Sequence, residues 1–103
     1  MTSKIETLKK FLADDPSDPF NHYALALEYV GLKKYTEALR QFENALNVDR
    51  NYVPAYHQAG LLLAQLGRTK DALEMFEKGV QAAALVGDTH AVQEMQEAID
   101  ELE

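Results

Sequence analysis

The sequence repeats itself at an interval of 34 residues between Pro19 and Val86. A fixed period of this length is typical of stacked helical hairpins, in which each repeat buries its apolar face against its neighbours. The repeat therefore predicts an all-α fold and, since such arrays usually bind other proteins, a role in protein binding. Six aligned pairs of positions carry identical residues: Leu27/Leu61, Leu32/Leu66, Ala38/Ala72, Leu39/Leu73, Phe42/Phe76 and Glu43/Glu77.

Apolar spacing and helix-capping residues predict about six helices in a single domain spanning residues 1–103. Ser3 and Asp18 are expected to cap helices, with Pro19 at a first helical position and Gly67 just beyond a helix end. Asp88 or Thr89 is expected to cap the last helix. The expected parts are an N-terminal helix at 3–13, repeat one at 19–52 (helices 19–32 and 35–48), repeat two at 53–86 (helices 53–66 and 69–86), and a C-terminal capping helix at 88–102.

Charge is unevenly distributed along the chain. The net charge is −7, and residues 88–103 hold six acidic residues and no Lys or Arg. Such a chain repels phosphate backbones, so we expect no nucleic-acid partner. There is no cysteine and therefore no disulfide or thiolate metal site. No secretory signal and no membrane-length apolar run is visible, which predicts a cytoplasmic protein without a membrane partner.

The sequence contains no pattern that indicates catalysis or metal binding. Its histidines, His22, His57 and His90, are not spaced three or four residues apart, as a helical zinc site would require. The two serines, Ser3 and Ser17, are explained by helix starts or turns, and no glycine-rich phosphate loop is present. We therefore expect no enzymatic activity, no cofactor and no metal, and expect each histidine to be either hydrogen-bonded or solvated.

The order of small and large residues within each repeat resembles the tetratricopeptide repeat. The resemblance covers nearly the whole chain and implies a right-handed superhelical stack of antiparallel hairpins. Small residues would let two helices cross closely, and large residues would fill the space beside each crossing. Three features depart from the family pattern: His22 stands where Trp is usual, Arg50 stands where Pro is common, and the turn glycine appears as Gly67 in the second repeat only. The matching residues are His22, Leu25, Ala26, Tyr29, Ala38, Phe42 and Ala45 in repeat one, and Tyr56, Ala59, Gly60, Leu63, Ala72, Phe76 and Gly79 in repeat two.

The helix expected at 19–32 is apolar on nearly every side, so it must be buried on more than one side. One stripe is expected to face its hairpin partner and neighbours: His22, Leu25, Ala26, Tyr29 and Leu32. The resemblance implies that a second stripe lines a concave groove for a partner peptide, with basic residues at its rim. An apolar strip with a basic edge suits an amphipathic or extended peptide with a few acidic residues. The expected groove residues are Phe20, Tyr23, Leu27, Val30 and Lys34, then His57, Leu61, Ala64, Gln65 and Arg68.

The apolar strip could also be covered by something other than a partner peptide. The molecule's own terminal helices could cover it, or a second copy could form a homodimer through it. Many tetratricopeptide domains that hold acidic chaperone tails use Lys and Asn on the groove helices. The matching places here hold Tyr23, Leu27, Gln58 and Leu61, so binding of that kind is not implied.

The last helix also admits two interpretations. Its apolar residues recur at spacings of three, four and three, and are expected to be buried: Val92, Met95, Ile99 and Leu102. The first interpretation is a cap, which a short solenoid needs at its open end. The second is a dimer seam or a docking face for a basic partner.

Overall fold

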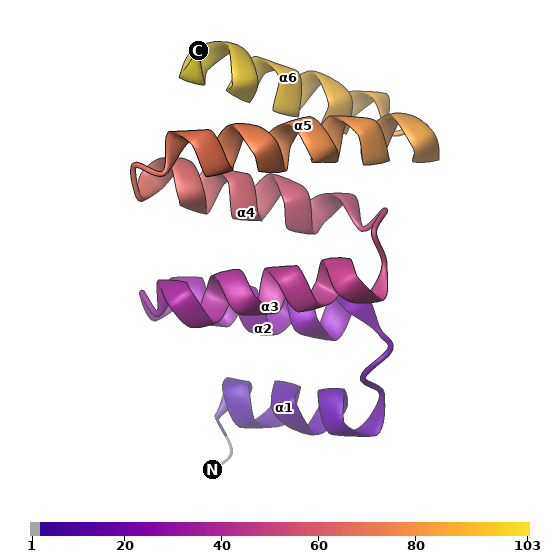
Figure 1. Cartoon of the computed structure of the whole chain (residues 1–103). Helices are drawn as coiled ribbons and strands as arrows, with labels where there is room; N and C mark the ends of the chain where they lie inside the picture. Colours follow the sequence, from indigo (N-terminus) through magenta and orange to yellow (C-terminus); the bar gives the residue numbers. More distant parts are fainter. Residues whose placement is uncertain (1–2) are drawn as a thin grey trace. The chain divides into compact units, whose positions relative to one another are not determined.

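A computed structural model describes residues 3–103, and these residues form six helices and no strand (Figure 1). Each helix begins and ends within one residue of its expected bounds, and the all-α fold of helical hairpins is confirmed. No helix in this described part is long and apolar enough to span a bilayer. The helices are α1 (Lys4–Asp14), α2 (Pro19–Gly31), α3 (Tyr35–Val48), α4 (Val53–Gln65), α5 (Thr69–Val86) and α6 (Thr89–Leu102).

The helices form two compact units that meet in the sequence between Arg50 and Asn51. In unit 1, α2 and α3 pack as a hairpin and α1 packs against α2, with Lys4 Nζ lying 3.0 Å from Glu28 Oε1. In unit 2, α4 and α5 pack as a hairpin, and α6 packs mainly against α5 and also contacts α4. The expectation of a single domain over residues 1–103 stays a prediction.

Side-chain caps begin three of the helices. Ser3 Oγ accepts a hydrogen bond from the Glu6 amide at 3.1 Å, and Asp18 Oδ1 accepts one from the Phe20 amide at 2.9 Å. Asp88 Oδ1 caps α6 by accepting from the Ala91 amide at 3.0 Å. Each bond satisfies a backbone donor that has no partner inside its helix. The expected caps at Ser3 and Asp18 are confirmed, and Asp88 rather than Thr89 caps the last helix.

The two hairpins turn in the same way, although only the second uses glycine. The amide of Lys34 donates to the Tyr29 carbonyl at 2.9 Å, and the amide of Arg68 donates to the Leu63 carbonyl at 2.9 Å. This bond belongs to the Schellman motif, which places the preceding residue in the left-handed region. That residue is Gly67 (φ 78°) in unit 2 but Lys33 (φ 59°) in unit 1. The first hairpin therefore carries a backbone strain that the second avoids.

Lys33→Gly is expected to raise the free energy of unfolding of unit 1 by about 1 kcal/mol, because glycine adopts positive φ without the Cβ penalty. The reciprocal change Gly67→Lys is expected to lower that of unit 2 by a similar amount, since a Cβ there meets no atom within 4 Å and only the backbone is strained. Denaturant unfolding followed by circular dichroism measures both changes. A stabilising Gly67→Lys would contradict the argument, and Lys34→Gly, at a residue with φ −92°, is the control that should not stabilise.

Small residues lie where the helices cross most closely. Ala26, Ala38 and Ala72 are completely buried. A Cβ at Gly60 would lie 2.5 Å from a ring carbon of Phe76, and one at Gly79 would lie 2.5 Å from Met95 Sδ. Native cores are close-packed, so these positions leave no room for a methyl group without rearrangement. The expected pairing of small and large residues is confirmed.

Three expectations about buried residues were wrong or incomplete. Leu32 is 55% exposed rather than buried, because it is the C-cap of α2 and lies beyond the packed turns. In α6, Ala91 is buried, while Val92 and Leu102 are half-buried. Successive side chains of a helix point about 100° apart. A small error in the expected rotation of a helix therefore assigns burial to a neighbouring residue. Met95 (0% exposed) and Ile99 (6%) are buried as expected.

Candidate functional site

The expected outward stripe of α2 is only partly exposed. Phe20 is 56% exposed and Leu27 is 39% exposed, whereas Tyr23 and Val30 are half-buried. Phe20 is the second residue of α2, after the cap Asp18 and Pro19, and Leu27 lies two turns further along the same side. Phe20 and Leu27 are therefore the side chains of α2 that offer most apolar surface to a partner.

Tyr23 and His57 occupy equivalent repeat positions, and each packs against the large phenylalanine of its own hairpin. The ring centroids of Tyr23 and Phe42 are 6.0 Å apart, and those of His57 and Phe76 are 6.4 Å apart. Burial also raises the pKa of the Tyr23 phenol above 10.0. Ring pairs at these separations contribute to packing. Tyr23 thus belongs partly to the hairpin core, and its replacement would disturb folding as well as any binding.

Helix α4, the first helix of unit 2, has a shorter apolar strip. Leu61 is 45% exposed, Gln65 is exposed, and His57 and Ala64 are half-buried. Leu61 repeats Leu27 at the interval of 34 residues, and both leucines are exposed, whereas the repeated Phe42 and Phe76 are buried. Leu27 and Leu61 therefore each leave part of an apolar side chain open to a partner. That the strips of α2 and α4 line one common groove stays a prediction.

The two cations expected at the rim differ in their surroundings. Lys34 is exposed at the N-cap of α3. Arg68 instead donates from Nη2 to Asp71 Oδ2 at 2.7 Å and from Nε to the same oxygen at 3.1 Å. This ion pair offsets much of the charge of Arg68, so the rim of unit 2 is less basic than the sequence suggests.

His22 is hydrogen-bonded and His90 is exposed, as expected, whereas His57 is half-buried against the Phe76 ring. His22 Nδ1 lies 3.2 Å from Gln41 Oε1, and His22 Nε2 lies 3.2 Å from the Pro16 carbonyl, so its ring links the α1–α2 connection to α3. His90 is exposed and lies 3.0 Å from Glu94 Oε1. Over residues 3–103 no three His, Cys, Asp or Glu side chains gather in a way that could hold a metal ion.

Several exposed apolar side chains were missed by the sequence analysis. Leu85 is 77% exposed and Val86 is 56% exposed in the last turn of α5, and Phe11 of α1 is 51% exposed. The length of α5 gives the signal, because it has 18 residues where its counterpart α3 has 14. Leu85 and Val86 lie at the end of this additional turn, which has no helical counterpart in repeat one.

Comparison with known proteins identifies the repeat. The family model described as tetratricopeptide repeat matches residues 21–52 and 53–84. Protein DIA2 of Eremothecium gossypii is 29% identical over 99 residues, and the match covers 90% of this chain but only 14% of that protein. A tetratricopeptide repeat domain protein from Salinibacter ruber has a solution structure that matches with a TM-score of 0.81 and 36% identity, covering 86% of this chain and 90% of that chain.

A second solved structure shares the fold at low sequence identity. The TPR2B domain of yeast Sti1, in its complex with pHsp70, matches with a TM-score of 0.88 at 18% identity, covering 95% of this chain and 78% of that chain. The two adjacent family matches fall within the two repeats. The chain therefore belongs to the tetratricopeptide repeat family.

Proposed function

We propose that this protein is a non-enzymatic interaction module that binds a peptide or helix of a partner protein through the apolar strips of α2 and α4. The observation that carries the proposal is the repeated leucine, Leu27 and Leu61, which is exposed in both units. Exposed apolar side chains that lie along one side of a helix, as Phe20 and Leu27 do on α2, mark interaction sites more often than scattered ones do. Phe20 extends the strip of α2.

The fold supports this proposal. Helical repeat arrays present extended surfaces to other proteins, and the Sti1 domain that shares the fold forms a complex with pHsp70. At 18% identity that likeness concerns the fold, so it does not name this protein's partner. A homodimer formed through the same strips or through α6 is the alternative.

The test is selection of peptides from a displayed random library by the purified protein, followed by fluorescence anisotropy of the selected peptides. Phe20→Ser/Leu27→Ser is expected to weaken binding at least about tenfold, because losing two apolar contacts removes more than about 1.4 kcal/mol. Phe20 is 56% and Leu27 39% exposed, so the variant should lose less stability than a substitution in the core would cause. Tyr23 is a poorer probe because its ring packs on Phe42.

Leu85→Ser is the matched control, since Leu85 is exposed but lies outside both strips. It should leave binding unchanged. Selected peptides that bind wild type and Phe20→Ser/Leu27→Ser equally would exclude the α2 strip. Sedimentation equilibrium at micromolar concentration tests the alternative, and a dimer that dissociates in the same double variant would favour self-association.

A further inference from the structure

The free face of α6 carries polar and charged side chains throughout. Glu94, Glu97 and Glu101 follow one another at spacings of three and four, so they share one stripe of the helix. Two of these carboxylates contact other groups, with Glu94 beside His90 at 3.0 Å and Glu97 accepting from Gln93 at 3.3 Å. No Lys or Arg follows Lys78 in the sequence. The stripe is therefore negative even when His90 carries a proton.

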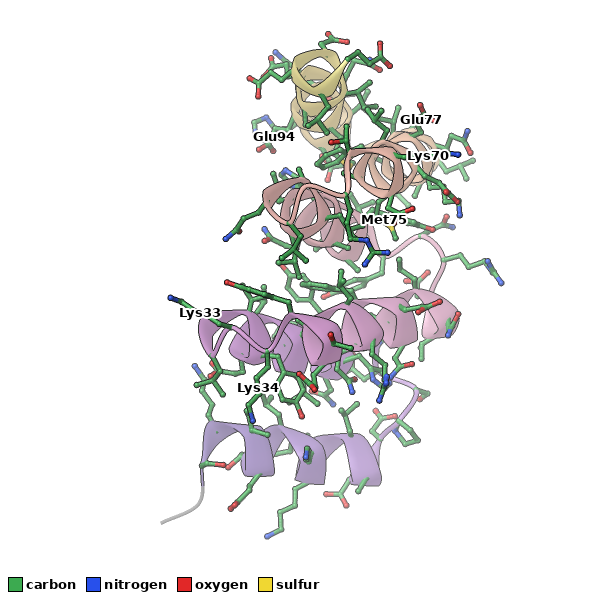
Figure 2. All side chains as sticks on the ribbon, turned by 60° about the vertical axis from the view of Figure 1, so that its left-hand side comes forward. Lys33, Lys34, Lys70, Met75, Glu77 and Glu94 are labelled. Atoms are coloured by element: carbon green, nitrogen blue, oxygen red, sulfur yellow. The ribbon has the colours of Figure 1, made fainter. Side chains whose placement is uncertain are left out.

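This stripe, which we call the glutamate stripe, lies on the α4 side of unit 2. Figure 2 shows Glu94 on the side of α6 where α4 lies, while Lys70 and Glu77 of α5 project from the opposite side. Both α4 and α6 pack tightly against α5, because a Cβ at Gly79 would lie 2.8 Å from Tyr56 Cβ as well as 2.5 Å from Met95 Sδ. Since α4 and α6 also contact each other, the side of α6 that carries Glu94 adjoins α4.

We propose that unit 2 binds a basic amphipathic segment of a partner protein, with an apolar residue against Leu61 and Lys or Arg side chains against the glutamate stripe. This inference rests on the proposed function and adds the chemistry of the partner. It reverses the sequence-based expectation of a peptide with acidic residues. The reversal follows because Arg68 is paired with Asp71, whereas the glutamate stripe has no Lys or Arg beside it in residues 3–103.

A second copy of the chain fits this surface less well than a separate partner does. The chain's own basic amphipathic helix is α1, but its Ile5, Leu8 and Leu12 are already half-buried in unit 1. Lys4 of that helix is paired with Glu28 at 3.0 Å. Two copies would each carry a net charge of −7, which opposes their association.

The experiment uses a fluorescein-labelled helical peptide of about 18 residues, with leucines at helical spacing on one face and lysines elsewhere. A companion peptide carries glutamate in place of every lysine. Both are titrated with the full chain by fluorescence anisotropy at about 0.15 M salt, where long-range charge effects are screened beyond about 8 Å. The test variants are Glu94→Gln/Glu97→Gln/Glu101→Gln and Leu61→Ser. Their matched controls are Glu37→Gln/Glu43→Gln/Glu77→Gln, which removes three exposed carboxylates of α3 and α5, and Leu85→Ser.

Saturable binding of the lysine peptide is expected, with about a tenfold loss in each test variant and less than about a twofold change in each control. Equal losses in the two triple variants would show that net charge alone attracts the peptide, and would overturn the inference. Tighter binding of the glutamate peptide, or no saturable binding of the lysine peptide, would also overturn it. If Leu61→Ser still weakens binding of the glutamate peptide, the proposed function survives and only the proposed chemistry of the partner is wrong. A dimer that dissociates in the α6 triple variant would instead assign the surface to a second copy.

Discussion

Deletion of Asp88–Glu103 is expected to lower the free energy of unfolding of unit 2 by about 3–6 kcal/mol. The deletion removes Met95 and Ile99, which are 0% and 6% exposed, and burying each such side chain stabilises a fold by about 1.5–3 kcal/mol. It also exposes the face of α5 around Gly79, against which Met95 packs. Small domains are stable by only about 5–15 kcal/mol, so thermal unfolding should show a large fall in melting temperature.

Point variants separate the loss of these packing contacts from the other effects of deleting the segment. Met95→Ala is expected to cost about 2–5 kcal/mol, because it leaves a cavity between α5 and α6. Gln96→Ala, at the next residue on the exposed side, should change stability by no more than about 0.5 kcal/mol. A melting temperature that is unchanged by the deletion would show that α6 is not part of the core of unit 2.

The features that the sequence predicted correctly are those that depend on neighbouring residues. Asp18 followed by Pro19 marks a helix start because a carboxylate satisfies the first free amides and proline needs none. Gly67 marks a helix end because it adopts positive φ. The interval of 34 residues then places the same elements twice, so helix bounds could be predicted to within one residue.

Some features that the sequence missed depend on contacts between side chains that are distant in the sequence. The residues next to Tyr23 in the sequence do not indicate that its ring packs against Phe42 rather than pointing outward, since both orientations fit an apolar helix face. The pairing of Arg68 with Asp71 could have been anticipated from their spacing of three residues, which favours an ion pair on a helix. The sequence predicted which apolar side chains belong to the candidate site. How much of each side chain is buried depends on the packed structure.

Phe76→Ala is expected to lower the free energy of unfolding of unit 2 by about 3–5 kcal/mol, because the ring is completely buried and its loss leaves a cavity. The ring also explains why residue 60 is glycine, since a Cβ there would lie 2.5 Å from a ring carbon. Gly60→Ala alone should therefore cost about 1–3 kcal/mol through overpacking.

In the Phe76→Ala background, the same Gly60→Ala change should become stabilising by up to about 1 kcal/mol. The ring no longer occupies the space, and alanine favours a helix interior over glycine. The double-mutant cycle from denaturant unfolding should thus give a coupling of about 1–4 kcal/mol between residues 60 and 76, as expected for residues in contact. Ala26, the equivalent of Gly60 in repeat one, is already alanine, so Ala26→Gly is the matched control and should destabilise unit 1. An equal cost for Gly60→Ala in both backgrounds would show that some group other than the Phe76 ring excludes a methyl group at residue 60.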